Sequence, residues 1–212
     1  MAKILSSKCK LCRRAGVKLF LKGDRCLSSK CALVKKAYPP GDHGLSDGRR
    51  PSVSEYGKQL IEKQKLKRVY GISEKQLRNY YVAAGKKKGV LGDNLLYLLE
   101  SRFDNIVYRL GIAKSRSQSR QLISHSMFTV NGKVLNVPSA ILKVGDVIAV
   151  KKTKLNKKII EEAKVVLKKK KAEVKWLDFN PTKMEGKVVS NPTRDEIGLT
   201  VNTSMVIEFY SR

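Results

Sequence analysis

Several features that identify common protein classes are absent or scarce in this 212-residue sequence. No apolar run approaches the roughly 18–20 residues that a membrane-spanning helix needs. The first few residues also lack the apolar region of a signal peptide. Acidic residues are scarce, since 18 Asp and Glu face 45 Lys and Arg, for a net charge of +27. We therefore expect a soluble, intracellular protein that binds a polyanion.

Residues and motifs typical of enzymes are also scarce. The chain has two histidines, His43 and His125. It contains no Gly-rich phosphate loop with its Lys, no pair of metalloprotease histidines and no G-x-S-x-G motif. The sequence therefore predicts a protein that is not an enzyme and has no small-molecule substrate.

The basic residues are distributed over the whole chain. Residues 1–50 hold 13 basic and 3 acidic residues, and residues 101–150 hold 7 and 2. Proteins that bind an anionic membrane surface usually concentrate their charge on one amphipathic helix or one polybasic segment. An even distribution therefore favours nucleic acid as the partner over a membrane.

All four cysteines fall early in the chain, at Cys9, Cys12, Cys26 and Cys31. The pattern C-x2-C, thirteen residues, C-x4-C suits a tetrahedral four-thiolate metal site, because each close pair supplies two ligands. Basic neighbours are expected to lower the thiol pKa values and favour the thiolates. The pattern predicts one structural zinc ion, with an iron–sulfur cluster as the alternative. Disulfides are disfavoured in an intracellular protein.

A segment rich in proline and glycine follows the cysteines at residues 38–44. Its paired prolines and two glycines exclude both a helix and a central strand. We interpret it as an extended arm on RNA, with Tyr38 and His43 available for stacking on bases. The alternative interpretation is a simple linker.

Hydrophobic periodicity and capping residues predict mostly helices. The expected helices cover residues 52–70, a segment from 73 to the lysines at 86–88, residues 93–110, a segment opening at Ser115, and residues 155–175. Alternation around Asn131 and Gly132 predicts a hairpin turn, and residues 141–150 supply further strand. The C-terminal segment after Asn202 fits a helix and a strand equally well. The fold class is therefore α+β.

Motifs spread over nearly the whole chain resemble those of the bacterial small-subunit ribosomal protein four family. They comprise residues 9–14, the pair Cys26 and Cys31, and residues 38–44, 62–66, 70–74, 99–102, 104–109, 115–121, 130–133 and 206–212. Three features depart from the family pattern. Residues 45–48 are less basic, Phe103 stands where Leu is usual, and many family members lack the four cysteines.

The resemblance implies a domain organisation and a function. The cysteine pattern assigns residues 1–44 to a zinc-binding segment with an extended arm. The resemblance implies a helical domain at 45–100 that is completed by 164–212. A small α/β RNA-binding module of two helices and a hairpin-rich sheet is then inserted at 101–163. Such proteins are structural components of the small ribosomal subunit in the cytoplasm. They bind the five-way junction in the 5′ domain of the ribosomal RNA and nucleate assembly. They also lie at the mRNA entry side beside ribosomal protein five and affect translational accuracy.

The candidate RNA contacts are basic and aromatic side chains, because structured RNA offers phosphates, 2′-hydroxyls and splayed bases. They are Arg13, Arg14, Lys35, Lys36, Tyr38, His43, Arg49, Arg50, Lys63, Lys65, Lys67, Arg68, Lys86, Lys87, Lys88, Arg102, Arg109, Arg116, Arg120 and Lys133. Two other functions require features that are not visible in the sequence. An enzyme that carries the same module, such as a pseudouridine synthase or a tyrosyl-tRNA synthetase, needs a catalytic domain. A zinc-dependent DNA-binding regulator needs a recognition helix and a dimerisation segment.

Overall fold

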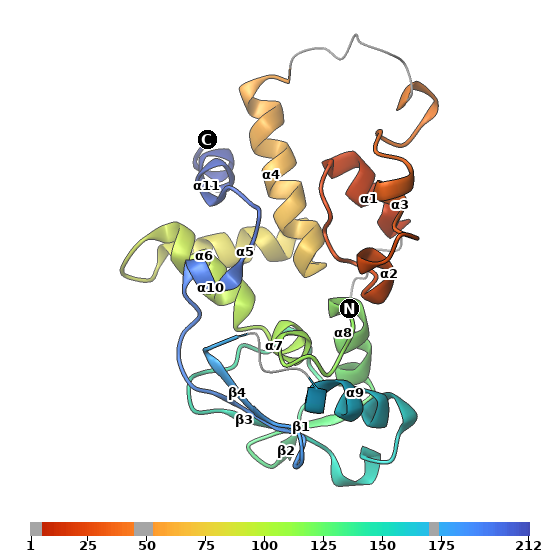
Figure 1. Cartoon of the computed structure of the whole chain (residues 1–212). Helices are drawn as coiled ribbons and strands as arrows, with labels where there is room; N and C mark the ends of the chain where they lie inside the picture. Colours follow the sequence, from red (N-terminus) through yellow and green to blue (C-terminus); the bar gives the residue numbers. More distant parts are fainter. Residues whose placement is uncertain (1–5, 45–52, 170–173) are drawn as a thin grey trace. The chain divides into compact units, whose positions relative to one another are not determined.

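The computed structural model describes residues 6–44, 53–169 and 174–212. The chain divides into two compact units. The first unit comprises the residues up to Leu95 together with Leu199–Arg212, and the second comprises Leu96–Gly198. Figure 1 shows the elements of both units along the chain. Helices and a five-stranded antiparallel sheet together confirm the predicted α+β class.

Every described secondary-structure element of the first unit is a helix. Its elements are α1 (Lys8–Ala15), α2 (Asp24–Leu27), α3 (Ala32–Lys35), the short 3-10 helix η1 (Asp42–Gly44), α4 (Glu55–Tyr70), α5 (Glu74–Gly85), the start of α6 (Leu91–Glu100) and α11 (Thr203–Ser211). The C-terminal segment, whose sequence fits two structures equally, is a helix. Asn202 caps it, because its side chain accepts hydrogen bonds from the backbone amides of Ser204 and Met205.

Local capping residues set the ends of α4 and α5. The Ser54 side chain accepts a hydrogen bond from the Gly57 amide at the start of α4. Gly71 ends this helix in the left-handed conformation, with φ of 64°. A reciprocal capping box between Ser73 and Gln76 then starts α5. These helices begin and end close to where the sequence predicted.

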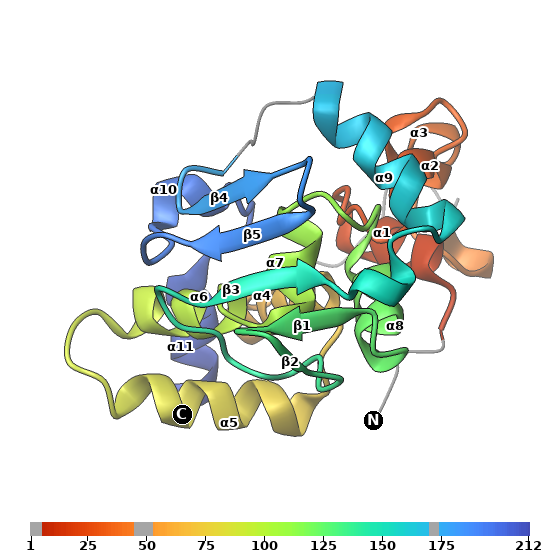
Figure 2. The same cartoon turned by 90° about the horizontal axis from the view of Figure 1, so that it is seen from below.

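The second unit combines a sheet with helices. Its elements are the end of α6, α7 (Phe103–Arg109), α8 (Arg116–Ser124), β1 (Phe128–Val130), β2 (Lys133–Val134), β3 (Val147–Val150), the 3-10 helix η2 (Lys152–Lys154), α9 (Lys158–Lys169), β4 (Leu177–Asn180), β5 (Glu185–Val188) and α10 (Arg194–Ile197). The strand order is β2-β1-β3-β5-β4, and every neighbouring pair is antiparallel (Figure 2). The predicted hairpin is present, because Asn131 and Gly132 join β1 to β2 with φ of 49° and 79°.

An apolar core lies in the second unit and joins its helices to the sheet. Phe103 and Ile106 of α7 pack with Phe128 of β1 and Ile148 of β3, and all four side chains are almost completely buried. The rings of Phe103 and Phe128 meet edge to face, with centroids 6.1 Å apart. Figures 1 and 2 show α7 lying on one face of the sheet. This core supports the short loops that join α6, α7 and α8.

The predicted helix over 93–110 is two helices in the structure, α6 and α7. The chain leaves the helical conformation at Arg102, which has extended dihedral angles and forms an isolated bridge with Ile141. The Ser101 carbonyl accepts a hydrogen bond from the Leu142 amide, and the Phe103 amide donates a hydrogen bond to the Ala140 carbonyl. Hydrogen bonds to a distant segment therefore replace the helix, although the apolar periodicity continues through the break.

The second unit extends beyond residue 163, where the module was expected to end. β5 pairs with β3 through the register Ile148↔Gly186, and β4 pairs with β5, so residues 177–188 complete the sheet. Gly186 is needed at this pairing, because an added Cβ would lie 2.7 Å from Leu110 Cδ1. The helix expected over 155–175 corresponds to α9, which begins at Lys158 and is described to Lys169, and residues 170–173 of that expectation lie outside the described residues. Within residues 6–44, 53–169 and 174–212, no helix combines the length and hydropathy that crossing a membrane requires.

Candidate nucleic-acid interface and cysteine pocket

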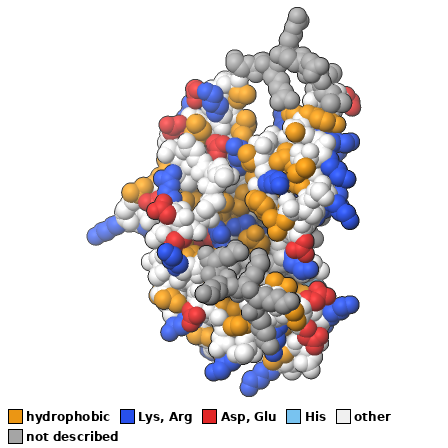
Figure 3. Space-filling model, in the orientation of Figure 1, with side chains coloured by type: hydrophobic (Ala, Val, Ile, Leu, Met, Phe, Trp, Pro, Cys, Tyr) orange, Lys and Arg blue, Asp and Glu red, His pale blue; other side chains and the backbone are white. Residues whose placement is uncertain are grey.

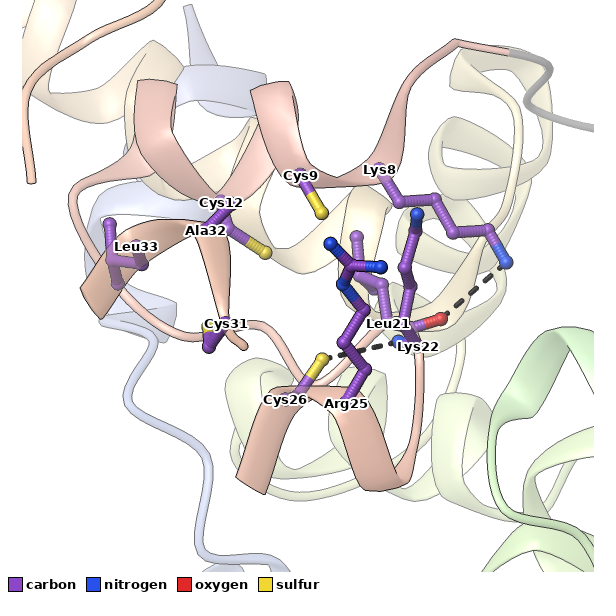
Figure 4. Close-up of a pocket in the computed structure, with 10 residues that line it drawn as sticks. All are labelled: Lys8, Cys9, Cys12, Leu21, Lys22, Arg25, Cys26, Cys31, Ala32 and Leu33. Carbon is purple, nitrogen blue, oxygen red and sulfur yellow. Dashed lines mark hydrogen bonds between the residues drawn. The ribbon is translucent and has the colours of Figure 1, made fainter. Parts of the chain in front are cut away.

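The four cysteines line one pocket in the first unit. Cys9 and Cys12 lie on α1, Cys26 lies on α2, and Cys31 precedes α3. Figure 4 shows the sulfur atoms of Cys9, Cys12 and Cys26 pointing toward a common space. All four thiols are free, so the structure contains no disulfide among them. The two sequence pairs are thus brought together, as a shared metal site requires.

The electrostatics of this pocket differ from the prediction. The pKa of Cys12 is raised, first by burial and then by the neighbouring Cys26, Cys9 and Cys31, although a hydrogen bond from the Leu19 backbone lowers it. The expectation that basic neighbours lower the thiol pKa is therefore wrong for Cys12. Several thiolates at this place need a cation to balance their charge.

The thiols do not form a finished metal site. Among the described residues, no group of three or more His, Cys, Asp or Glu side chains has an arrangement that could hold a metal ion. The donor set nevertheless suits zinc, because four soft thiolates are its usual structural ligands. The loop before α2 also contacts this donor set, since the Lys22 backbone amide donates a hydrogen bond to Cys26 Sγ at 3.3 Å.

Arg13 and Tyr38, two residues of the N-terminal segment that were predicted to contact RNA, contact each other. Arg13 donates from its guanidinium to the carbonyl oxygens of Tyr38 and Pro39, at 2.9 and 3.1 Å. Its guanidinium also lies 4.6 Å from the centre of the Tyr38 ring. Arg13 thereby fixes the arm that begins at Tyr38.

Of the remaining predicted RNA contacts near the arm, the structure describes some side chains and not others. Arg14, Lys35 and Lys36 are exposed. The backbone of His43 lies in η1, and its side chain falls outside the described part of the chain. Arg49 and Arg50 also lie outside the described residues, between positions 44 and 53.

Lys63 of α4 is buried, with 5% of its surface exposed. Its ammonium donates to Glu74 at 2.8 Å and lies 4.1 Å from the centre of the Phe209 ring. The prediction that Lys63 faces RNA is therefore wrong, because this side chain joins α4 to α5 and α11. Lys67 also binds Glu74, at 3.1 Å, and Lys65 pairs with Glu62.

Glu74 is the centre of this polar network. Burial alone raises the pKa of Glu74, but hydrogen bonds from Lys63, Tyr210 and Lys67 outweigh burial and bring the pKa below its ordinary value. The Tyr210 hydroxyl donates to Glu74 at 2.7 Å, and burial together with this bond raises the pKa of Tyr210. The network is structural and closes the C-terminal helix onto α4 and α5.

The other cations of the first unit are more accessible. Lys86, Lys87 and Lys88 are exposed in the turn after α5, where Asn94 donates to the carbonyls of Lys87 and Lys88. Arg68 is half-buried, and burial followed by the charge of Arg14 lowers its pKa. These positions remain candidates for phosphate contact.

Four arginines of the second unit gather around two buried carboxylates. Arg102 is completely buried and binds Asp104 through two bonds of 3.0 and 2.6 Å. The prediction that Arg102 faces RNA is wrong, because this guanidinium lies inside the protein. Arg120 approaches the same carboxylate less closely, at 4.0 Å.

Glu100 forms the second centre of this cluster and is completely buried. It accepts two bonds of 2.9 Å from Arg109 and one of 2.7 Å from the Asn105 amide. Arg109 also donates to the Ile197 carbonyl at 2.8 Å, so it is mainly a structural tie. Arg116 Nη2 lies 3.9 Å from Glu100.

Arg116 is held from three sides. In addition to Glu100, its Nε donates to Asn105 Oδ1 at 2.8 Å, and its guanidinium lies 4.5 Å from the centre of the Tyr108 ring. α8 places Arg116 and Arg120 four residues apart at its start, after the Ser115 cap. We name Arg102, Arg109, Arg116, Arg120, Glu100 and Asp104 the arginine cluster.

The arginine cluster carries a surplus of two positive charges, because four guanidiniums face two carboxylates. A fixed, positively charged surface of this kind binds phosphate oxygens, and arginine can bridge one phosphate with two bonds. Lys133 is exposed on β2 and does not belong to the arginine cluster. Figure 3 shows Lys and Arg side chains scattered over both units on the face in view.

Sequence reasoning missed Glu100, Asp104 and Asn105, which organise these arginines. Asp104 and Asn105 sit inside an apolar helical pattern, and all three residues are buried in the structure. An acidic residue in a buried, strongly basic segment is a signal that could have identified them, because a buried carboxylate requires a partner.

Comparison with known proteins places both units in one family. Residues 3–100 match the family model described as Ribosomal protein S4/S9 N-terminal domain, and residues 101–148 match the S4 domain. Proteins named small ribosomal subunit protein uS4 from Caldicellulosiruptor saccharolyticus and Syntrophomonas wolfei are each 49% identical over 212 residues, covering 100% of both chains. A protein of the same name from Clostridium tetani is 48% identical with the same coverage.

Proposed function

This chain belongs to the uS4 family of small ribosomal subunit proteins, and we therefore propose that it is an RNA-binding structural component of the small subunit. Its partner is the ribosomal RNA, and its place is in the ribosome in the bacterial cytoplasm. The relatives are named as ribosomal proteins, which agrees with the prediction that the chain is not an enzyme.

The arginine cluster is the observation that carries RNA binding. Arg116 and Arg120 are held at the start of α8 with about one-seventh of each side chain exposed. A polyanion with closely spaced phosphates suits two guanidiniums that lie one helical turn apart. The net charge of +27 supports the same partner, because each phosphate contact releases counterions and adds affinity.

The proposed interface comprises the predicted cations that the structure leaves at least partly exposed. They are Arg14, Lys35, Lys36, Lys65, Lys67, Arg68, Lys86, Lys87, Lys88, Arg116, Arg120 and Lys133. Arg102 and Lys63 are left out because they are buried, and Arg13 and Arg109 are assigned to structural ties.

The proposal includes the finer role implied by the family resemblance. The protein would bind the five-way junction of the 5′ domain and nucleate assembly of the subunit body. It would then lie at the mRNA entry side next to ribosomal protein five and contribute to translational accuracy. Support for this role is the match to uS4 proteins over the full length of this chain.

Zinc binding by the cysteine pocket is a second part of the proposal. The support is geometric, since Cys9 and Cys12 of α1, Cys26 of α2 and Cys31 before α3 line one pocket. Because the thiols lack a finished metal geometry, zinc would have to draw them together. When bound, the ion would tie α1, α2 and α3 to one another. An iron–sulfur cluster is the alternative, and it would give visible absorption.

A gel-shift titration tests the proposed partner. The probes are the folded 5′ domain of small-subunit ribosomal RNA, an unrelated RNA duplex, and a DNA duplex of the same length. We expect tight binding to the 5′ domain and binding to the other two only at higher protein concentration. Equal affinity for all three probes, together with no co-sedimentation with small subunits from a lysate, would contradict the proposal. Preference for the DNA duplex would instead support a DNA-binding regulator.

A further inference from the structure

The two carboxylates of the arginine cluster require an explanation that charge alone does not give. Glu100 is completely buried and Asp104 is 3% exposed, and both reduce the positive charge of a unit that is proposed to bind RNA. Burying a carboxylate has a large desolvation cost that only close partners offset. A surface that depended on charge alone would gain affinity without them.

The four arginines divide into two pairs with different geometry. Arg102 and Arg109 each make two short bonds to a carboxylate, so their guanidiniums are committed to the protein. Arg116 and Arg120 approach the same carboxylates less closely, at 3.9 and 4.0 Å, and their side chains are 14% and 15% exposed, close to the 17% of Arg109. The first pair anchors the carboxylates, and the carboxylates then orient the second pair.

Glu100 reaches Arg116 by two routes. Directly, its Oε1 lies 3.9 Å from Arg116 Nη2. Indirectly, it accepts a bond from the Asn105 amide nitrogen, and this fixes the Asn105 oxygen that accepts Arg116 Nε at 2.8 Å. Tyr108 supplies a flat surface against the guanidinium. The plane and position of the guanidinium are therefore set within the protein.

We infer that Glu100 is a positioning residue that orients the Arg116 guanidinium for RNA before the RNA arrives. The inference rests on the proposed RNA binding and adds a determinant of specificity to it. A guanidinium that is already ordered loses less conformational entropy on binding. A guanidinium held in one orientation also favours an RNA whose phosphates or bases lie along its N–H bonds, whereas a mobile guanidinium binds many arrangements of these groups.

Replacing Glu100 separates positioning from charge. In the full-length chain, Glu100→Gln keeps the size of the side chain but removes one negative charge. Affinity for an unrelated RNA duplex should stay equal or rise, because the cluster becomes more positive. Affinity for the folded 5′ domain should fall, so the ratio of the two affinities should drop by at least about fivefold.

Glu161→Gln is the matched control. Glu161 is exposed on α9 in the same unit, and its replacement makes the same change of charge and shape. Here the two affinities should shift in the same direction and by the same factor, leaving the ratio unchanged. An unchanged ratio in Glu100→Gln would overturn the inference, because the carboxylate would then have no effect on selectivity. An equal loss of both affinities would also overturn it, since that indicates a purely structural role.

A second variant keeps the inference testable if Glu100→Gln does not fold. Tyr108→Leu removes the ring beside Arg116 without changing any charge, and circular dichroism and thermal melting establish that each variant is folded. The affinity ratio should again fall, and an unchanged ratio in a folded Tyr108→Leu would refute the positioning mechanism. Failure of the wild-type protein to distinguish the 5′ domain from the duplex would instead refute the proposed function.

Discussion

The N-terminal segment and the second unit are stabilised in different ways. Among residues 6–44, the buried hydrophobic side chains are three cysteines and Leu19. Among its described residues, the second unit has twenty buried hydrophobic side chains in one cluster, including Trp176, the single tryptophan of the sequence. A segment with so small a core cannot offset its conformational entropy by apolar burial. The comparison predicts that residues 6–44 need a further stabilising contact, which the proposed zinc ion would supply.

The helical part of the first unit is intermediate between these two regions. It buries Leu66, Leu77 and Val206. It also depends on the network in which Glu74 holds Lys63, Lys67 and Tyr210. Electrostatic contacts here serve the fold, whereas those of the arginine cluster serve both the fold and the proposed interface.

Removing the proposed metal should have the largest effect. Structural zinc contributes roughly 10–16 kcal/mol in comparable small sites at neutral pH. A chelator under reducing conditions, or Cys12→Ser combined with Cys31→Ser, should therefore make residues 6–44 sensitive to proteolysis. Trp176 fluorescence, which reports the second unit, should melt at an unchanged temperature. Protein that contains no metal by elemental analysis, yet keeps this segment protected, would contradict the zinc proposal.

A substitution that leaves a cavity in the second unit should have the next largest effect. It should destabilise the second unit and leave residues 6–44 unchanged. Phe128 is completely buried against Phe103, so Phe128→Ala should reduce the free energy of unfolding by about 3–5 kcal/mol. Trp176 fluorescence should show an earlier transition in denaturant. The reactivity of the four cysteines toward a thiol reagent should not change, and increased reactivity would show that the two regions are not independent.

Removing Arg116 and Arg120, whose side chains are about one-seventh exposed, should weaken RNA binding. The double variant Arg116→Ala with Arg120→Ala should make the negative slope of log affinity against log salt shallower, by roughly 0.7–0.9 for each phosphate that it no longer neutralises. Lys183→Ala, in the exposed turn between β4 and β5, is the control and should leave the slope nearly unchanged. An unaltered slope in the double variant would remove the arginine cluster from the interface.

The smallest effect is expected from acid pH. The pKa of Glu74 lies below its ordinary value of 4.5, so the ionised form favours the folded state. This stabilisation is present above pH 4.5 and is lost as the pH falls through the pKa of the folded protein. Hydrogen exchange in α4, α5 and α11 should accelerate in that range. Glu74→Gln should lack this component, and the side chain is 45% exposed, so the effect is modest.

Much of the local structure could be predicted from the sequence, because the signals act over a few residues. The cap at Ser54, the capping box at Ser73 and the Asn131–Gly132 turn lie where the sequence placed them. Such signals depend on backbone groups within about one turn, so distant residues rarely override them. The spacing of the cysteines likewise indicated a shared site, and the fold brings them to one pocket.

The errors concerned charged residues whose partners lie far along the chain or across a break in a helix. Lys63 is buried because Phe209, 146 positions later in the sequence, covers it. Arg102 is buried because the strand-like bridge to Ile141 interrupts the helix and turns this side chain toward Asp104. A lysine or arginine pattern gives no information about such partners.

Composition and local pattern by themselves determined that this protein is a basic α+β chain with an early four-cysteine segment, and its motifs carried the resemblance to a ribosomal protein family. Charge and short-range backbone preferences are properties of the sequence alone. Only the tertiary structure decided which cations are accessible, where the second unit ends, and that Glu100 and Asp104 orient the arginines. Burial and the pairing of β5 with β3 depend on contacts between segments distant in sequence, and those contacts form when the chain folds.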